Sequence, residues 1–441
     1  MSRKKQAVGD FRYETGAGKV GWPAVGEPLG IDDLMRTIEF LVPQGAGSPT
    51  AYRKQLAQTR KAIEALCLTG GTATKLTLGN QVKQLEEAVQ RYLGVKHALF
   101  LTNATAGFEI AYNMAGLRPG DEVIVPAITF IATIVYPLAI GAKVVLADLD
   151  PRTLNLDPAD VARRITPRTR MIVPVHIGGW PVEMAPLMRL ARQHDLVVLE
   201  DAAHAFGGMY RGRRTGTIGH FGAYSFHEVK NINAFGEGGL LVTNTKYGRQ
   251  FSKSRFVGLD LSTHIPDWLY DVTTIPGMRG SFVAGNHSAT EIQAVALHSQ
   301  MQRIDRIIAA RREVAQELNR RFARVPGIQG TPMDHGETRG THHLYQLQID
   351  PDVVGADIQD LKQKLTDRGV TQIPHFGPLY KFQIMRQLGY DTEAIQAGCP
   401  VCEDLFAHRF THLPIYGLSA AQVRYLGDAV IESVEELRRG Q

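Results

Sequence analysis

The sequence predicts an α/β protein: a mostly parallel mixed sheet flanked by helices, followed by a smaller C-terminal α+β domain. Two observations carry this prediction. Short apolar runs alternate with amphipathic stretches through the middle of the chain, a pattern typical of parallel strands joined by helices. The chain has 441 residues, of which 44% are hydrophobic and 21% charged, so it can bury a full core in two or three domains.

Composition and periodicity divide the chain into three parts. Residues 1–70 form an N-terminal extension with scattered glycine and proline, in which only Tyr52–Leu66 has a helical pattern. Residues 71–305 form the large domain. The stretch Ala289–Ile308 has the pattern of one long helix that leaves this domain. Residues 306–441 have their own alternation and form the small domain.

The large domain begins with an amphipathic helix over Val82–Leu93, which ends near Gly94, a residue typical of helix C-termini. Its other elements follow from the alternation. The expected strands are Ala98–Leu101, Glu122–Pro126, Lys143–Ala147, Met171–Val175, Leu196–Leu199, Ala223–Phe226 and Leu240–Thr243, and the expected helices include Thr105–Ala115, Asp157–Ile165 and Pro186–His194.

Charge and cysteine content limit the partners and the compartment. The 49 basic and 44 acidic residues give a net charge of +5 and are spread along the chain. The sequence has no recognition-helix or aromatic–basic pattern, so we expect anionic small molecules rather than nucleic acid. The uncharged stretch Val123–Gly141 contains Pro126 and Pro137, which favours a strand, a loop and a buried helix over a membrane span. The 3 cysteines exclude a disulfide scaffold, and the N-terminus lacks the apolar core of a signal peptide, so we expect a cytoplasmic protein.

Ligands of open α/β sheets bind at the carboxyl ends of the strands, and the first such position is Leu101–Gly107. Small hydroxyl residues lie between a strand and a helix there. The helix N-terminus and the Thr105 hydroxyl suit a phosphate. Taken alone, the segment fits an ordinary threonine helix cap better.

A second position follows the strand Leu196–Leu199. Asp201 at a strand end can hold a protonated heterocycle, as the ring nitrogen of pyridoxal phosphate (PLP) requires. The position of Asp201 fits an ordinary helix-capping aspartate equally well. His204, one helical turn further on, either faces the same ligand or is structural.

The third position is the most informative. A strand brings Ser225 and Lys230 to its carboxyl end, and the glycine-rich turn Gly236–Gly239 returns the chain into the next strand. A lysine there can form a Schiff base with an aldehyde cofactor if its amine is partly neutral. Ser225 can reach a phosphate. In isolation, Lys230 also fits a surface lysine before a hairpin.

Together these segments are far more specific than any one of them. Thr105, Asp201, Ser225 and Lys230 occur in that order at expected strand ends, which resembles fold type I PLP enzymes. The sequence motifs around these residues resemble those of the DegT/DnrJ/StrS family of sugar aminotransferases, from about residue 76 to the C-terminus. The segments that carry the resemblance are Gly94–Ala98, Ala104–Ala106, Pro119–Pro126, Thr129–Phe130, Asp148–Asp150, Pro174–His176, Glu200–His204, Ser225–Phe226, Lys230–Asn231 and Gly236–Gly239.

The resemblance implies PLP as cofactor and a role for each matching residue. Lys230 would bind the cofactor covalently and shuttle the proton, and Asp201 would pair with the pyridine nitrogen. Phe130 would stack on the ring, and His204 would lie near the phenolic oxygen. The residues implied in phosphate binding are Thr105, Ala106 and Ser225, with Asn286 reaching the phosphate bound by a partner subunit. His375 would contact substrate.

Three features depart from the family pattern. Ser288 replaces a basic residue that usually follows Asn286. The stretch Gly258–Gly285, with Trp268 and Tyr270, is long and adjoins the substrate in the family, so the acceptor specificity is expected to be unusual. The N-terminal extension has no counterpart that can be aligned.

Two further motifs were weighed as metal or redox sites. Cys399 and Cys402 form a C-x-x-C, but a zinc site needs a second pair and the only other cysteine is Cys67. His342 and His343 are adjacent, and neighbours on a strand point to opposite faces. We therefore expect no metal site.

The resulting prediction is a PLP-dependent aminotransferase in a biosynthetic pathway. The amino donor would be glutamate or glutamine, and the acceptor a keto-sugar, above all a nucleotide-linked one, or a keto-cyclitol. The family implies a homodimer with shared sites. Two alternatives stay open: a non-catalytic PLP-binding regulator, and a PLP-dependent sugar dehydratase. In the dehydratase branch a histidine replaces the lysine, so Lys230 favours transamination.

Overall fold

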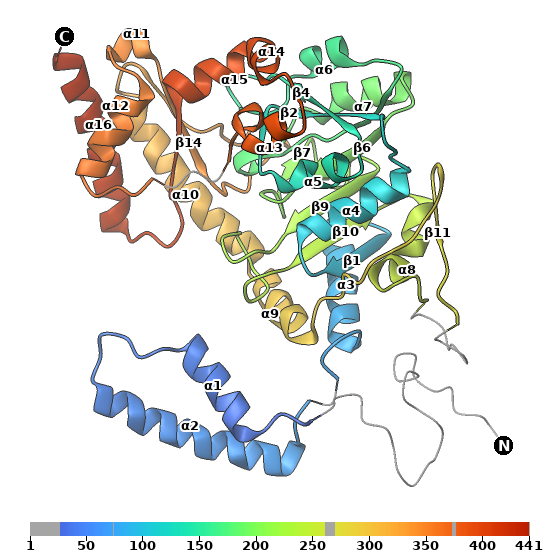
Figure 1. The fold of residues 1–441 in the computed structure, drawn as a ribbon. Coiled ribbons are helices and arrows are strands. Elements are labelled where there is room, and N and C mark those ends of the chain that lie inside the picture. Colours follow the sequence, from blue (N-terminus) through green and yellow to red (C-terminus); the bar gives the residue numbers. More distant parts are fainter. Residues whose placement is uncertain (1–26, 74, 261–269, 373–375, 441) are drawn as a thin grey trace.

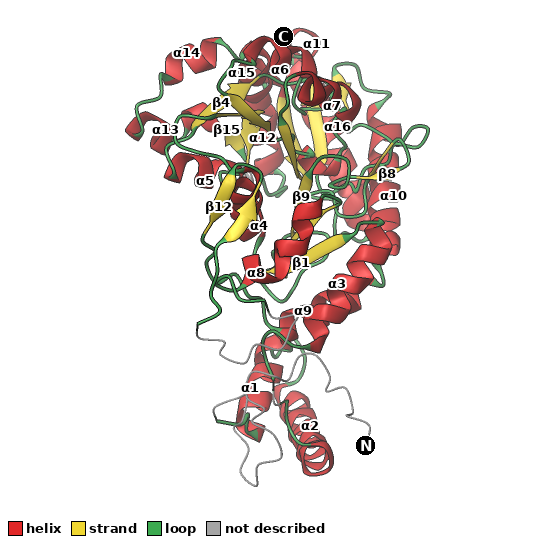
Figure 2. Ribbon diagram, turned by 90° about the vertical axis from the view of Figure 1, so that its right-hand side faces the viewer, coloured by secondary structure: helices red, strands yellow, loops and turns green. Residues whose placement is uncertain are grey.

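The computed structural model describes residues 27–73, 75–260, 270–372 and 376–440. A large α/β body contains the main sheet, and a smaller C-terminal unit lies beside it (Figure 1). Two N-terminal helices lie apart from the body, as both views indicate (Figures 1 and 2).

The main sheet has seven strands in the order β1-β10-β9-β6-β5-β2-β4. Their bounds are β1 His97–Leu101, β2 Glu122–Pro126, β4 Lys143–Ala147, β5 Thr169–Ile172, β6 Val197–Asp201, β9 Phe221–Ser225 and β10 Gly239–Thr243. β10 runs antiparallel to both of its neighbours, β1 and β9, and every other pairing is parallel. The expected mostly parallel mixed sheet is therefore confirmed.

Both faces of this sheet are covered because successive residues of each strand point to opposite sides. On β1, Leu99 and Leu101 pack with helix α4 (Ala104–Ala115). Ala98 and Phe100 pack with α3 (Asn80–Leu93) and α9 (Glu291–Met301) on the opposite face. Further along that second face, the sheet is covered by α6 (Pro158–Arg164) and α7 (Met184–Gln193).

The C-terminal unit is built on a three-stranded antiparallel sheet, in the order β13-β14-β16. The strands are β13 Ile328–Gln329, β14 Tyr345–Ile349 and β16 Phe410–Leu413, and the helices packed on them are α10 (Ile304–Phe322), α12 (Ile358–Asp367) and α16 (Ala420–Arg439). α10 runs from the large body into this unit (Figure 1).

The prediction of one long helix over Ala289–Ile308 is wrong. The chain forms α9, breaks at Gln302 and Arg303, and starts again as α10. No glycine or proline marks the break, so the sequence pattern runs through it. Ile304 is buried against the core of the large body. The expected domain division at 305/306 falls in the first turn of α10.

The N-terminal segment contains more helix than expected. The single expected helix at Tyr52–Leu66 is the longer α2, Pro49–Gly70. α1, Ile31–Leu41, was missed because glycines and prolines surround it. The two helices form a hairpin in which Arg60 binds Asp32 at 2.7 Å, yet α2 buries none of its residues.

The remaining elements connect or flank these layers. Near the site, β3 (Ile128–Thr129) pairs with β15 (Gly377–Pro378), and α5 (Ala132–Ala139) follows β3. The others are β7 Met209–Tyr210, β8 Arg213–Arg214, α8 Phe251–Arg255, β11 Ile275–Gly277, β12 Gly280–Phe282, α11 Pro351–Val354, α13 Gln383–Gln387, α14 Thr392–Ala397 and α15 Pro400–Asp404. Among the described helices, none combines the length and apolar character needed to span a bilayer.

Candidate active site

The carboxyl edge of the sheet brings the phosphate-binding candidates side by side. Strand register aligns Leu101 with Gly239, and Gly239 with Ser225. Helix α4 starts directly after β1, so its N-terminus lies at the same edge. Thr105 and Ala106 are in its first turn. The helix cap is Asn103, whose side chain accepts the Ala106 N–H at 3.0 Å, so Thr105 is not the cap and keeps its hydroxyl for another partner.

Gly239 permits this arrangement. A Cβ atom at this position would overlap the Asn103–Ala104 peptide, which passes directly over it. Only glycine therefore lets the β1–α4 connection lie against β10. The glycine-rich turn of the sequence thus has a steric role at the proposed phosphate end.

Lys230 lies in a compact loop between β9 and β10. Backbone bonds from Phe226 N to the Gly238 carbonyl (2.7 Å) and from Glu228 N to the Gly236 carbonyl (2.8 Å) close this loop, and Lys230 N donates to the His227 carbonyl. Burial lowers the pKa of the Lys230 amine to about 8, although the Asp201 and Glu237 carboxylates act in the opposite direction. The amine is therefore far closer to neutrality at pH 7 than an ordinary lysine.

Asp201 ends β6 with a buried carboxylate. Thr133 donates to its Oδ2 at 2.7 Å and the Ala203 N–H to its Oδ1 at 3.1 Å. Burial raises the pKa of Asp201, and the bond from Thr133, the bond from Ala203 and the charge of Lys230 oppose that rise. Within the part of the chain that the structure describes, these two donors bind the carboxylate, whose two oxygens have capacity for a further cationic donor.

Two aromatic residues, Phe130 and His204, are expected at the cofactor ring. The Phe130 carbonyl accepts the Thr133 backbone N–H at 3.2 Å and lies 3.0 Å from Thr133 Oγ1, and 59% of Phe130 is exposed. The His204 ring lies against the His343 ring, with 4.4 Å between centroids. His343 Nδ1 also lies 2.9 Å from Asn231 Oδ1, next to Lys230. The C-terminal segment around His343 therefore reaches the site.

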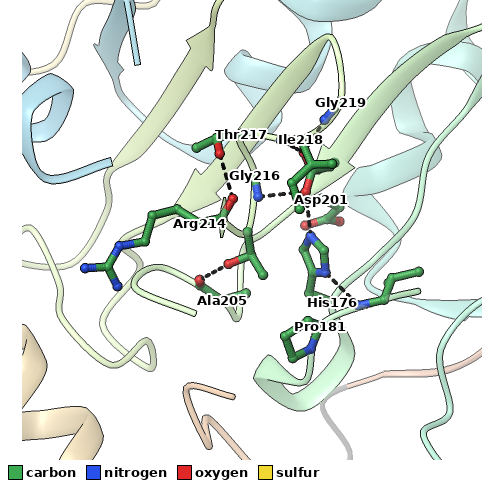
Figure 3. Close-up of polar contacts among 12 residues, drawn as sticks. His176, Pro181, Asp201, Ala205, Arg214, Gly216, Thr217, Ile218 and Gly219 are labelled. Atoms are coloured by element: carbon green, nitrogen blue, oxygen red, sulfur yellow. Dashed lines mark hydrogen bonds and ion pairs between the residues drawn. The ribbon is translucent and has the colours of Figure 1, made fainter. Parts of the chain in front are cut away.

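The residue before Asp201, Glu200, organises a buried polar cluster with His176, Gly216, Ile218 and Gly219, four residues that lie beside Asp201 (Figure 3). One oxygen of Glu200 accepts the N–H groups of Ile218 (2.6 Å) and Gly219 (2.5 Å). The other accepts from Gly216 (2.8 Å) and contacts His176 Nε2 at 3.0 Å. His176 Nδ1 accepts the Val182 N–H, so Nε2 carries the imidazole proton and donates it to Glu200. The cluster fixes the two segments that flank the end of β6, and we had not predicted it.

The remaining predicted site residues lie as follows. Asn286 is exposed, and its side chain accepts from Ser288 N at 3.1 Å. Its segment runs beside the end of β1, where Thr102 N donates to the His287 carbonyl. Ser225 Oγ accepts the His227 N–H at 3.3 Å. His375, like Trp268, lies outside the described residues.

The C-x-x-C motif is remote from this chemistry. Cys399 and Cys402 are both buried, and burial raises the pKa of the Cys399 thiol to about 12. Burial also raises the pKa of Cys402. Neither thiol is poised to react, and no group of three or more metal-ligating side chains occurs within the described ranges.

Residues 58–431 match the model of the DegT/DnrJ/EryC1/StrS aminotransferase family. The chain belongs to this family. As a member of the DegT/DnrJ/EryC1/StrS family it is a PLP-dependent aminotransferase with the type I fold, as its sequence motifs predicted. It is 33% identical over 380 residues to the spore coat polysaccharide biosynthesis protein SpsC of Bacillus subtilis, covering 83% of this chain and 91% of SpsC.

A second relative of this family member is GDP-perosamine synthase of Caulobacter vibrioides, 34% identical over 330 residues, covering 74% of this chain and 84% of the relative. Among solved structures, the sugar aminotransferase Spr1654 of Streptococcus pneumoniae in its PMP form superposes with a TM-score of 0.72 at 25% identity. That superposition covers 83% of this chain and 93% of the other.

The residues at the carboxyl edge fit PLP. Asp201 is a buried carboxylate with spare acceptor capacity for a protonated ring nitrogen, and Lys230 is an amine of lowered pKa within electrostatic reach of it. The α4 N-terminus and Ser225 lie at one edge position, where backbone N–H groups suit a phosphate. Phe130 presents an open aromatic face.

Proposed function

We propose that this aminotransferase moves an amino group from glutamate or glutamine to a keto-sugar, above all a nucleotide-linked one. The observation that carries this proposal is the pairing of a partly neutral Lys230 amine with the buried Asp201 carboxylate at one sheet edge. The acceptor class is supported by the relatives, one named for polysaccharide biosynthesis and one for a GDP-linked product. Keto-cyclitols are the competing acceptors.

Each site residue has a proposed task in this reaction. Lys230 would hold the cofactor covalently, and its amine would serve as the base that moves a proton between the substrate and cofactor carbons. Asp201 keeps the ring nitrogen protonated. Phe130 and His204 hold the ring face and the phenolic oxygen. The phosphate is bound by Thr105, Ala106 and Ser225. When bound, PLP supplies the aldehyde that carries the amino group and a ring that delocalises electrons released by deprotonation.

The lowered pKa of Lys230 suits a residue that must both attack and shuttle a proton, because such a base works best near the operating pH. Burial provides the lowering, and Asp201 limits it. The chemistry therefore depends on the loop that holds Lys230 between β9 and β10.

We further propose a cytoplasmic homodimer in which Asn286 reaches the partner's phosphate site and His375 contacts the acceptor. In support, Asn286 is exposed at the edge of the site. Phe130 and Phe235 are also largely exposed, as are Ile292 and Val295 in a groove of about 700 Å³ on α9. Phe235, Ile292 and Val295 line that one groove, and contiguous exposed apolar surface is typical of an interaction site.

The deciding experiment follows labelled nitrogen. The purified protein is incubated with ¹⁵N-glutamate or α-amino-¹⁵N-glutamine and either a nucleotide-linked keto-sugar or an inosose, and the products are analysed by mass spectrometry. We expect ¹⁵N in the sugar product with wild type and none with Lys230→Ala. Label only in the cyclitol would reassign the acceptor. Loss of water without nitrogen gain would indicate the dehydratase, and a cofactor absorbance band that never responds to a donor would indicate the regulator.

A further inference from the structure

The buried carboxylate of Asp201 is the end of a chain of hydroxyl groups. Thr133, in α5, contacts Asp201 Oδ2 at 2.7 Å, and the Thr129 hydroxyl, at the end of β3, contacts the Thr133 hydroxyl at 2.9 Å. The exposed fractions are 3% for Asp201, 1% for Thr129 and 0% for Thr133. These three side chains therefore form a dry hydrogen-bonded relay.

The relay has a defined direction. A hydroxyl has one proton to donate, and Thr133 Oγ1 also lies 3.0 Å from the Phe130 carbonyl. The carboxylate is the stronger acceptor and the closer one, so the Thr133 proton points to Asp201. Thr129 then donates to the Thr133 oxygen, which polarises the second bond and strengthens it.

The surroundings of Asp201 give the relay a task. Burial disfavours the charged carboxylate, and the Thr133 bond is the largest of the contributions that oppose burial. The others come from the Ala203 N–H and from the nearby Lys230 and His176. The Tyr112 hydroxyl donates to the Thr133 carbonyl at 2.7 Å and so holds the backbone that carries the relay.

We propose that Thr133, backed by Thr129, is a positioning residue that keeps Asp201 ionised and aimed at the ring nitrogen of the cofactor. This rests on the role proposed for Asp201. The proton between the ring nitrogen and Asp201 lies on the nitrogen only while the carboxylate is the weaker base. Removing the Thr133 hydroxyl strengthens that base, so the proton moves toward Asp201.

The relay also connects two other parts of the site. Thr129 and Thr133 flank Phe130, so one turn of chain supplies both the ring-stacking candidate and the support for Asp201. Thr129 is fixed in turn by its pairing with Gly377 in β15, directly after the segment that contains His375. β15 therefore helps to hold the outer end of the relay.

The test uses holoenzyme loaded with PLP that carries ¹⁵N at the ring nitrogen, with the ¹⁵N chemical shift as readout. In Thr133→Val we expect the shift to move toward that of the unprotonated ring, as the proton-sharing ratio changes by roughly 10- to 100-fold. Thr133→Ser, which keeps the hydroxyl, should remain close to wild type. Thr129→Val should move the ¹⁵N shift in the same direction as Thr133→Val but by a smaller amount. It provides the test if Thr133→Val does not fold.

A matched control is Thr243→Val, which removes another buried hydroxyl, bonded to the His220 carbonyl in the sheet. It should leave the ¹⁵N shift unchanged. Asp201→Asn separates the two hypotheses. If Asp201→Asn moves the shift and neither threonine-to-valine variant does, the relay is refuted and Asp201 keeps its role. If Asp201→Asn leaves the shift unchanged, the role of Asp201 itself fails.

Discussion

Replacing Glu200 with glutamine should sharply destabilise the loop behind the active site. The carboxylate accepts two donors on each oxygen: Ile218 and Gly219 on one, Gly216 and His176 on the other. A glutamine side chain can accept on one side only, and its NH₂ faces two donors on the other. Two charge-assisted bonds of about 1.5–3 kcal/mol each are lost, so the free energy of unfolding should fall by about 3–6 kcal/mol.

Urea unfolding of the apoprotein, followed by far-UV circular dichroism, measures this loss as a lower midpoint. The matched control is Glu403→Gln, whose carboxylate binds Lys381 at 2.7 Å but is 27% exposed. Glu403 also accepts from the Tyr380 hydroxyl at 2.6 Å, and the glutamine carbonyl oxygen can keep that bond. Partly exposed pairs of this kind contribute at most about 1 kcal/mol. If Glu200→Gln is no less stable than Glu403→Gln, the cluster is not organised by the carboxylate as we argue.

Three further predictions concern reactive groups and sterics. Lys230 has a pKa of about 8, and only the neutral amine attacks the PLP aldehyde. The rate at which the apoprotein captures PLP, followed by stopped-flow absorbance, should therefore rise with pH and reach half its plateau near pH 8. If burial were unimportant, the half-plateau would lie near the ordinary lysine value of 10.5. Gly239→Ala should weaken PLP binding at least tenfold in a fluorescence titration, because the added methyl group would displace the Asn103–Ala104 peptide. Unchanged affinity would mean that this peptide does not shape the proposed phosphate site. Cys399 and Cys402 should resist iodoacetamide in the native protein while the partly exposed Cys67 reacts, and rapid labelling of either in peptide mass mapping would contradict their burial.

The strands of the large domain follow closely from the sequence, because their apolar runs are short and bounded by charged or turn residues. Glu122–Pro126 and Lys143–Ala147 have the expected bounds. α1 did not follow, since its glycine- and proline-rich flanks hide an 11-residue helix. The break between α9 and α10 also escaped prediction, because it is set by packing of Ile304 rather than by a helix-breaking residue.

For the candidate site, strand-end reasoning selected residues suited to cofactor chemistry but not the residues that contact them. Thr105, Asp201, Ser225 and Lys230 were selected because each lies at an expected strand end. Thr133 and Glu200 interact with groups distant in sequence, and such partners leave no local signal. Thr129 ends β3 and Thr133 lies at the start of α5, so their four-residue spacing is not a helical repeat and gave no signal of their contact.

The position of β10 in the sheet has a consequence for how the protein is assembled. β1 lies at the edge of the sheet, and its only strand partner there is β10, about 140 residues later in the chain. A growing chain therefore holds β1 without a partner until residue 243 has been made, and long-range pairings of this kind form slowly. Because β10 also places Gly239 between Leu101 and Ser225, a half-made chain lacks part of the proposed phosphate site. PLP then binds only the completely folded chain, and this binding stabilises the folded state relative to every partly folded form by mass action.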